Sequence, residues 1–162
     1  MAELGKSDYH LLQAVGEHVV GVLADAKEVR VSGDGGSSFA DRTPPDTPLD
    51  VVFDPKDPNR MAVATKQGTF TSQDEGRSWR QRDNAATEQL AWGDRLYRAD
   101  PGGVIKVSGD GGVSWDDAGT VGATVNELAL DASGAVYASI AGGEVKRSTD
   151  GGASWTRLVK LK

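Results

Sequence analysis

The chain of 162 residues carries 18 basic and 24 acidic side chains, a formal net charge of −6 at pH 7 and no cysteine. The lack of cysteine excludes disulfides, thiolate-bound zinc and thiol catalysis, and scattered basic residues under a net negative charge argue against a nucleic-acid partner. No apolar run approaches the ~20 residues of a membrane span, so no membrane partner is expected either.

Short strands are expected along the whole chain after an N-terminal extension at residues 1–8. Each is rich in apolar residues and bounded by turn residues, and no segment has a helical pattern of useful length. In chain order the expected strands lie at 9–15, 18–23, 28–32, 49–53, 61–65, 69–72, 88–92, 95–99, 104–107, 125–130, 135–140, 144–148 and 153–161. The expected fold class is therefore all-β.

One motif, Ser-x-Asp-x-Gly-x-Ser followed by an aromatic residue, recurs four times along this series of strands. Its copies occupy residues 32–39, 72–79, 108–115 and 148–155, and their first serines are 40, 36 and 40 residues apart. A fixed period near 40 residues indicates a repeat architecture, and four-stranded meanders at this period are typical of β-propeller blades. The sequence thus predicts a β-propeller of four four-stranded antiparallel blades. The predicted blades lie at residues 9–43, 44–83, 84–120 and 121–162.

Each motif is expected to close the hairpin between the third and fourth strands of its blade. Its aspartate would accept hydrogen bonds from backbone N–H groups, the glycine at its fifth position would take a positive φ, and its aromatic ring would enter the core. The residues with this structural role are Ser32, Asp34, Gly36, Phe39, Ser72, Asp74, Gly76, Trp79, Ser108, Asp110, Gly112, Trp115, Ser148, Asp150, Gly152 and Trp155. Calcium requires six to eight oxygen ligands and each loop offers one carboxylate, so no metal and no cofactor is expected.

The motif resembles the Asp-box, or BNR repeat, of sialidases, xyloglucan-degrading enzymes, sortilin and photosystem assembly factors. With the Asp-Pro-x-Asp-Pro-Asn turn at 54–59 and the Ala-Trp-Gly-Asp-Arg-Leu-Tyr segment at 91–97, the order of blades also resembles the later blades of bacterial exo-sialidase-like proteins. The resemblance covers nearly the whole chain and implies a β-propeller. It implies a family often found outside the cytoplasm, whereas the first eight residues lack the apolar centre of a signal peptide, so the compartment stays open.

The resemblance to sialidases can be tested against the sequence. Those enzymes share an arginine triad that grips a carboxylate, a tyrosine nucleophile with a glutamate partner, and an aspartate acid. Tyr97 and Tyr137 occupy equivalent second-strand positions, which indicates packing, and no arginine has the local context of the triad. No catalytic residue is therefore predicted, and a glycoside hydrolase, or an inactive remnant of one, is the alternative function.

Polar residues recur near the start of the first strand of each blade, which in a propeller lines the central channel. His10, Asp50, Glu88 and Asn126 lie 22, 22, 20 and 22 residues before their motif serines, with Glu127 as an alternative to Asn126. Channel mouths are common ligand sites, so these side chains are candidates to bind a cation or a small polar ligand. The alternative interpretation is that strand starts are polar because they are solvated.

Four blades in an open stack leave an apolar face on the first and on the last blade, and exposed faces of that size usually mean association. The expected assembly is a head-to-tail dimer that closes an eight-bladed ring with two-fold symmetry. The rival is an engineered or excised half-propeller that closes as a four-blade ring or pairs otherwise. The expected function is a non-catalytic scaffold or binding module for a protein, glycan or small ligand.

Overall fold

The computed structural model describes residues 9–23 and 27–160, so the predicted extension at residues 1–8 and the end of the last expected strand lie outside the described residues. The described residues form sixteen strands and no helix, which confirms the all-β prediction. Because this part of the chain contains no helix, none in it is long and apolar enough to cross a membrane.

The strands form four separate antiparallel sheets, each with its strands in chain order, and these sheets are the predicted four-stranded blades. The strands are β1 (Tyr9–Val15), β2 (His18–Leu23), β3 (Val29–Ser32), β4 (Ala40–Arg42), β5 (Pro48–Asp54), β6 (Asp57–Thr65), β7 (Gly68–Ser72), β8 (Arg80–Gln81), β9 (Gln89–Trp92), β10 (Leu96–Asp100), β11 (Val104–Ser108), β12 (Asp116–Thr120), β13 (Val125–Leu130), β14 (Val136–Ile140), β15 (Glu144–Ser148) and β16 (Thr156–Lys160). Blades 1 to 4 below are the sheets β1–β4, β5–β8, β9–β12 and β13–β16.

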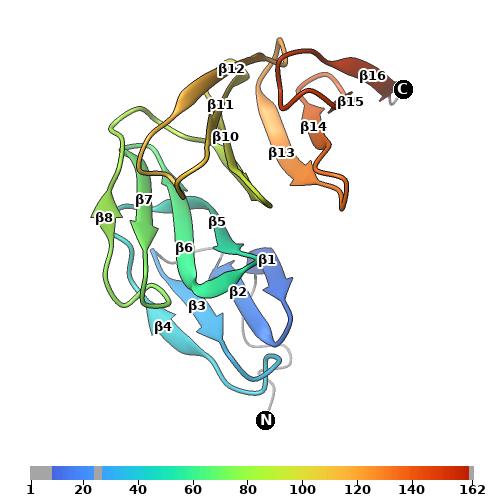
Figure 1. Ribbon diagram of the computed structural model, residues 1–162. Coiled ribbons are helices and arrows are strands. Elements are labelled where there is room, and N and C mark those ends of the chain that lie inside the picture. The colour runs from blue at the N-terminus through green and yellow to red at the C-terminus, as the bar shows by residue number, and fades with distance from the viewer. Residues whose placement is uncertain (1–8, 24–26, 161–162) are drawn as a thin grey trace.

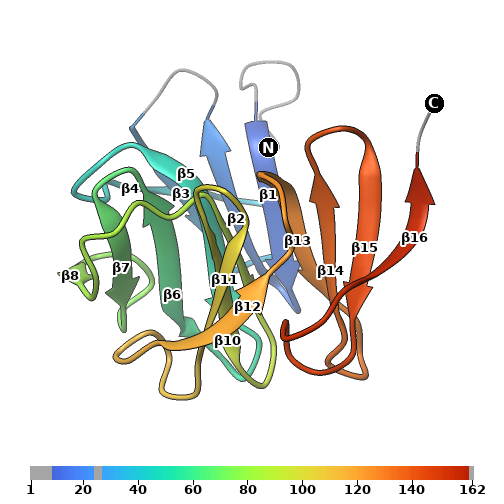
Figure 2. The same ribbon diagram turned by 90° about the horizontal axis from the view of Figure 1, so that it is seen from above.

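The blades stand side by side in an arc (Figure 1). Their first strands, β1, β5, β9 and β13, face the concave inner side, and their last strands lie on the outer side. In Figure 2 most strands of the four sheets lie roughly along one common axis, and neighbouring strands of a sheet point in opposite directions. In Figure 1 the arc stays open between blade 1 and blade 4, so each end blade has one face that no neighbouring blade of this chain covers.

Apolar side chains fill the space between neighbouring blades, since alternate residues of a strand point to opposite faces of its sheet. Valines of blade 1 pack against Val51, Phe53, Met61, Val63 and Phe70 of blade 2. A second large cluster joins blades 3 and 4. The cluster between blades 2 and 3 is smaller and consists of Val52, Ala62, Ala64, Leu90 and Leu96.

A buried arginine completes the boundary between blades 2 and 3. Arg98 on β10 is fully buried, and its guanidinium lies 3.0 Å from Asp100 Oδ1 and 3.2 Å from Asp83 Oδ2. It also donates to Thr69 Oγ1 at 3.4 Å and stacks over the Trp115 ring, 4.7 Å from the ring centroid. Burial raises the pKa of Asp100 although Arg98 opposes this. The sequence pattern did not point to this ion cluster, because Arg98 stands where the neighbouring blades have Val63 and Ala138.

The four motif loops share four internal hydrogen bonds. In the blade 2 loop, Ser72 Oγ donates to Asp74 Oδ1 at 2.7 Å and accepts from Gly76 N at 2.8 Å. Ser78 donates its backbone N–H to Asp74 Oδ1 and its hydroxyl to Asp74 Oδ2, at 2.8 and 2.6 Å. The Ser78 hydroxyl is the main reason that the pKa of Asp74 is lowered to about 2. Gly76 has a φ of 77°, as the motif requires of a glycine.

The aromatic residues that end the motifs are half-buried and pack at the edges of the clusters between blades. Trp79, Trp115 and Trp155 each contact the cluster that their blade shares with the blade before it. Phe39 has no preceding blade to contact in this chain, and its ring lies 6.2 Å from the ring of Tyr9 instead.

Candidate ligand site on the inner strands

The predicted row of polar residues does not occupy one equivalent position. His10 and Asn126 fall at β-bulges, where the pairing with the second strand skips one residue. The bulge in blade 2 falls at Leu49, so Asp50 lies one position further along its strand. Equal spacing in sequence therefore misplaced Asp50, because it did not account for the bulges. Glu88 lies just before β9 and donates its backbone N–H to Ala99 O.

The true equivalents of Asp50 are Leu11, Gln89 and Glu127. Each pairs with the second-strand residue three positions after the one opposite the motif serine. From the sequence, Glu127 was expected only as an alternative to Asn126, and Gln89 was not expected in this row. Aligning the blades by strand pairing, rather than by the number of residues before the motif serine, identifies both Gln89 and Glu127.

Asp50 is buried, and its carboxylate accepts hydrogen bonds from the backbone. Its carboxylate accepts the N–H of Val51 at 2.7 Å and the N–H of Leu90, on the first strand of the next blade, at 2.7 Å. Gln13 makes the same kind of link, since its Oε1 accepts Phe53 N at 3.0 Å. These side chains satisfy backbone donors on the inner edges of the sheets, which have no neighbouring strand. Burial raises the pKa of Asp50 to about 7, against the effect of its two N–H donors.

Gln89 and Glu127, at the equivalent positions in blades 3 and 4, have no such backbone partner among the described residues. Gln89 Oε1 is buried and finds no hydrogen-bond donor among the described residues, and the same holds for Glu88 Oε2. Partial burial raises the pKa of Glu127. The inner side of blades 3 and 4 thus gathers acceptor atoms that the described residues leave unused, and unsatisfied buried acceptors are costly unless a ligand or water supplies a donor.

Two cavities follow the inner strands. One, of about 370 Å³, is lined by the polar residues His10, Thr47, Gln89, Asn126 and Glu127 together with apolar residues of blades 1 and 2. The other, of about 260 Å³, has walls from all four first strands and includes Asp50 and, again, Glu127. The structure therefore brings His10 and Asn126 together, places Asp50 in the adjoining cavity, and leaves Glu88 outside the lining of both.

The polar groups of the 370 Å³ cavity suit a ligand that donates hydrogen bonds. Its polar lining residues carry the carboxylate of Glu127, the amides of Gln89 and Asn126, the hydroxyl of Thr47 and the imidazole of His10. No group of three or more potential metal ligands occurs among residues 9–23 and 27–160. A ligand that brings N–H groups, as an ammonium or guanidinium does, would satisfy these acceptors and the charge of Glu127.

No family model and no curated protein matches this chain. Solved structures do resemble it. An ancestral GH74 enzyme matches with a TM-score of 0.74 at 19% identity, over 94% of this chain and 24% of that chain. YCF48 from Cyanidioschyzon merolae matches with a TM-score of 0.61 at 23% identity, over 69% of this chain and 37% of that chain.

A structure of YCF48 bound to a D1 peptide matches with a TM-score of 0.59 at 13% identity, over 99% of this chain and 55% of that chain. This chain thus spans between 24% and 55% of the length of these three proteins. Identities this low show a common β-propeller fold and carry no activity with them.

Proposed function

We propose that this chain is a non-catalytic β-propeller module that binds a peptide with a basic side chain in the cavities along its inner strands. The observation that carries the proposal is the set of unused acceptors on blades 3 and 4, above all the buried Gln89 Oε1 beside Glu127. The peptide-bound YCF48 structure, which has the same fold, supports a peptide as the ligand class. The cavities also fall in the size range of ligand pockets when taken together.

Isothermal titration with short lysine-containing peptides tests this proposal. Glu127→Gln removes the charge and keeps the side-chain shape, so it should weaken binding about tenfold or more, as expected for a hydrogen bond to a charged group. Glu17→Gln, the same change on the exposed turn after β1, is the matched control and should bind like wild type. Equal affinity of both variants, or equal binding of peptides without a basic residue, would contradict the proposal.

We further propose that the four loops are Asp-box repeats. Their spacing near 40 residues and the shared pattern of serine, aspartate and glycine hydrogen bonds support this assignment. In this proposal the loops hold the hairpins and take no direct part in binding, because each motif aspartate is already occupied by donors of its own loop.

Self-association through the end blades is also part of the proposal. Leu12 on β1 is 60% exposed, whereas its equivalents Val51, Leu90 and Leu128 are at most 3% exposed because a preceding blade covers them. Blade 4 of a second copy would supply the missing cover. Sedimentation of the wild type should then give a dimer that Leu12→Asp dissociates, while Val113→Asp, at an exposed apolar residue of the blade 3 loop, leaves it intact. A wild-type monomer at all concentrations would rule this part out.

A glycoside hydrolase is the second candidate, favoured by one observation. Asp50, with its pKa near neutrality, lines the same cavity as the carboxylate of Glu127, and glycosidases use two carboxyl groups. Against it, Val51 and Leu90 occupy both carboxylate oxygens of Asp50. A panel of fluorogenic glycosides decides the matter: turnover that Glu127→Gln abolishes would support hydrolysis, and absence of turnover would leave the binding module.

A further inference from the structure

A separate cavity of about 360 Å³ lies where hairpin turns of blades 2, 3 and 4 meet, away from the inner-strand site. Its walls come from Pro55 and Lys56, from residues 93–95 and from the turn at residues 131–134, with Tyr97 and Leu130 behind them. Leu130 is the one residue that it shares with the cavities described above. It therefore has a lining, and a chemistry, of its own.

The acidic groups of this cavity already have partners. Asp94 Oδ1 lies 2.9 Å from Lys56 Nζ, an ion pair that lowers the pKa of Asp94. Asp131 accepts from the hydroxyl of Ser133 at 2.6 Å and from that of Tyr137 at 3.0 Å. These two carboxylates are therefore ionised, hydrogen-bonded and not available to balance a further cation at the cavity.

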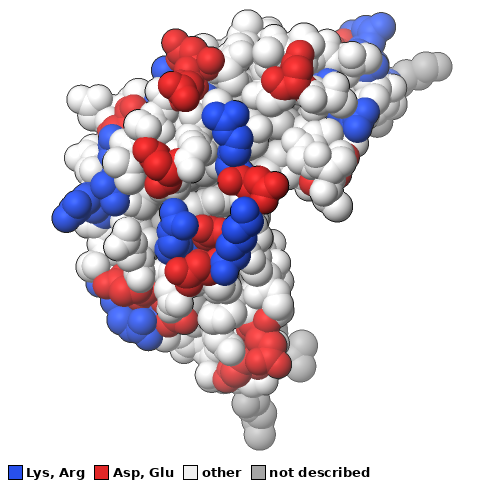
Figure 3. Space-filling model, viewed as in Figure 1, with Lys and Arg blue, Asp and Glu red and all other residues white. Residues whose placement is uncertain are grey.

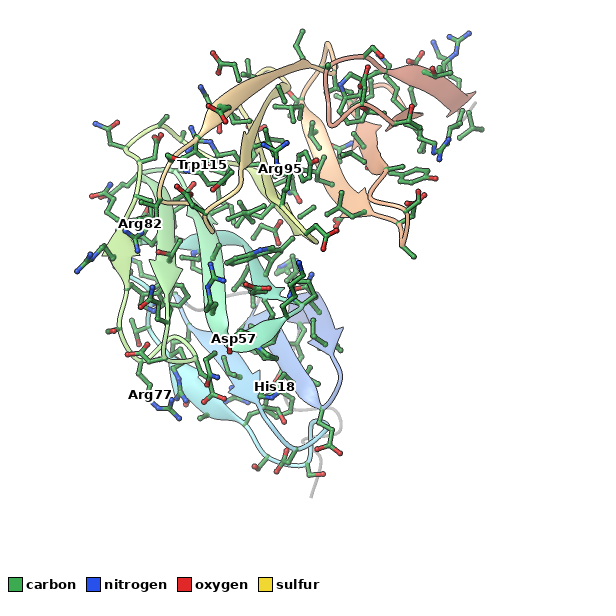
Figure 4. The ribbon with its side chains drawn as sticks, in the orientation of Figure 1. His18, Asp57, Arg77, Arg82, Arg95 and Trp115 are labelled. Atoms are coloured by element: carbon green, nitrogen blue, oxygen red, sulfur yellow. The ribbon has the colours of Figure 1, made fainter. Side chains whose placement is uncertain are left out.

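Arg95 is the cation left over. It is exposed, lines the cavity, and has no ion-pair or hydrogen-bond partner for its side chain among the described residues. Figure 4 labels Arg95 on blade 3, on the side toward β13 of blade 4. Figure 3 shows acidic and basic side chains interspersed over this view of the molecule, with no broad positive patch. The electrostatic attraction for an anion at the cavity would therefore come from the Arg95 guanidinium itself.

Tyr97 provides a second polar group. Its ring is buried, 6% exposed, in the cluster between blades 3 and 4, and the residue also lines the cavity. No described residue donates to or accepts from its hydroxyl. Its O–H is therefore free to donate to a ligand in the cavity.

We propose that this cavity binds a small carboxylate with a short apolar chain. The planar guanidinium of Arg95 matches a carboxylate with two parallel hydrogen bonds, and the Tyr97 hydroxyl donates a third. The apolar chain lies against Pro55, Leu130 and Ala132, which offer the cavity's hydrophobic surface. This site is independent of the peptide site on the inner strands, because no polar residue is common to both.

An NMR titration of the ¹⁵N-labelled full chain with hexanoate tests the proposal. The amides of Gly93 and Gly134, on two walls of the cavity, should shift with one saturating affinity. Two further probes separate the parts of the ligand: 1-hexanol has the chain without the charge, and inorganic phosphate has charge without the chain. Both should shift these amides at least tenfold more weakly than hexanoate.

Variants make the outcome specific. Arg95→Gln should lower the affinity for hexanoate about ten- to a hundredfold, the range expected for hydrogen bonds to a charged group, and Tyr97→Phe should lower it severalfold while keeping the ring in the core. Arg80→Gln, at an exposed arginine of blade 2, is the control and should bind like wild type. Unchanged affinity in Arg95→Gln, phosphate binding as tight as hexanoate, or shifts confined to the inner strands would each overturn the proposal.

Discussion

Replacement of Arg98 by methionine should destabilise the fold strongly and in a pH-dependent way. Methionine keeps an apolar stem of similar length and removes the charge that lies 3.0 Å from Asp100 and 3.2 Å from Asp83. Removing one partner of a buried ion pair costs about 3–5 kcal/mol, since the other charge stays buried without compensation. The side chain of Asp83 is 25% exposed and can rehydrate, so we expect the lower end, about 3 kcal/mol at pH 7.5.

The pH dependence follows from Asp100, whose pKa burial already raises. Without the guanidinium that pKa rises further. An acid with a raised pKa stabilises the folded state at low pH, below its unfolded value near 4, and loses this contribution as the pH rises through the folded value. The difference in unfolding free energy between wild type and Arg98→Met should therefore shrink to less than half between pH 7.5 and pH 4.

Urea denaturation followed by tryptophan fluorescence is the assay, because Trp115 lies directly against Arg98. Arg157→Met is the control: Arg157 is 61% exposed and pairs with Glu144 at 3.4 Å, so its loss should cost less than about 1 kcal/mol. A cost below about 1 kcal/mol for Arg98→Met at pH 7.5, or a cost that does not change with pH, would refute the argument.

Three further changes test the fold. The raised pKa of Asp50, about 7, predicts that stability falls from pH 5 to 7, by up to about 1.4 kcal/mol per pH unit, and that Asp50→Asn flattens this slope in urea titrations. Ser72→Ala leaves the buried N–H of Gly76 unpaired and should cost about 1–3 kcal/mol in the same assay. Gly102 and Gly103 both have positive φ, but a Cβ at Gly103 alone would overlap a backbone carbonyl, so thermal melting should show Gly103→Ala to be far less stable than Gly102→Ala.

The sequence predicted the blades well because each carries a local signal of its own. The motif fixes the hairpin between the third and fourth strands, and the hydrogen bonds among its serines, aspartate and glycine all lie within one eight-residue loop. Strand ends were less certain: the turn expected at residues 54–59 is in fact shorter, because β6 already begins at Asp57. The assignment of His10, Asp50, Glu88 and Asn126 to one row was wrong in register. The β-bulge at Leu49 shifts Asp50 by one position along its strand, and the number of residues between Asp50 and its motif serine does not reveal that shift.

Contacts between blades were the part that the sequence could not give. That Arg98 would be fully buried, or that Asp50 would cap Leu90, depends on which faces meet across 40 residues of chain. Both residues look like ordinary polar positions in strands whose neighbours are apolar. Only the assembled arc shows that one neutralises two carboxylates and the other satisfies the backbone of the next blade.

The ion cluster at Arg98 also bears on how repeated units find their correct order. Blades with similar sequences and similar apolar faces invite pairing with the wrong neighbour, a common failure of repeat proteins during folding. Apolar clusters such as those between blades 1 and 2 and between blades 3 and 4 discriminate weakly. If blade 3 packed against a blade other than blade 2, Arg98 would lose its contact with Thr69, and its buried guanidinium would be poorly solvated. The arginine thus favours the contact of blade 3 with blade 2 at the middle junction of the arc.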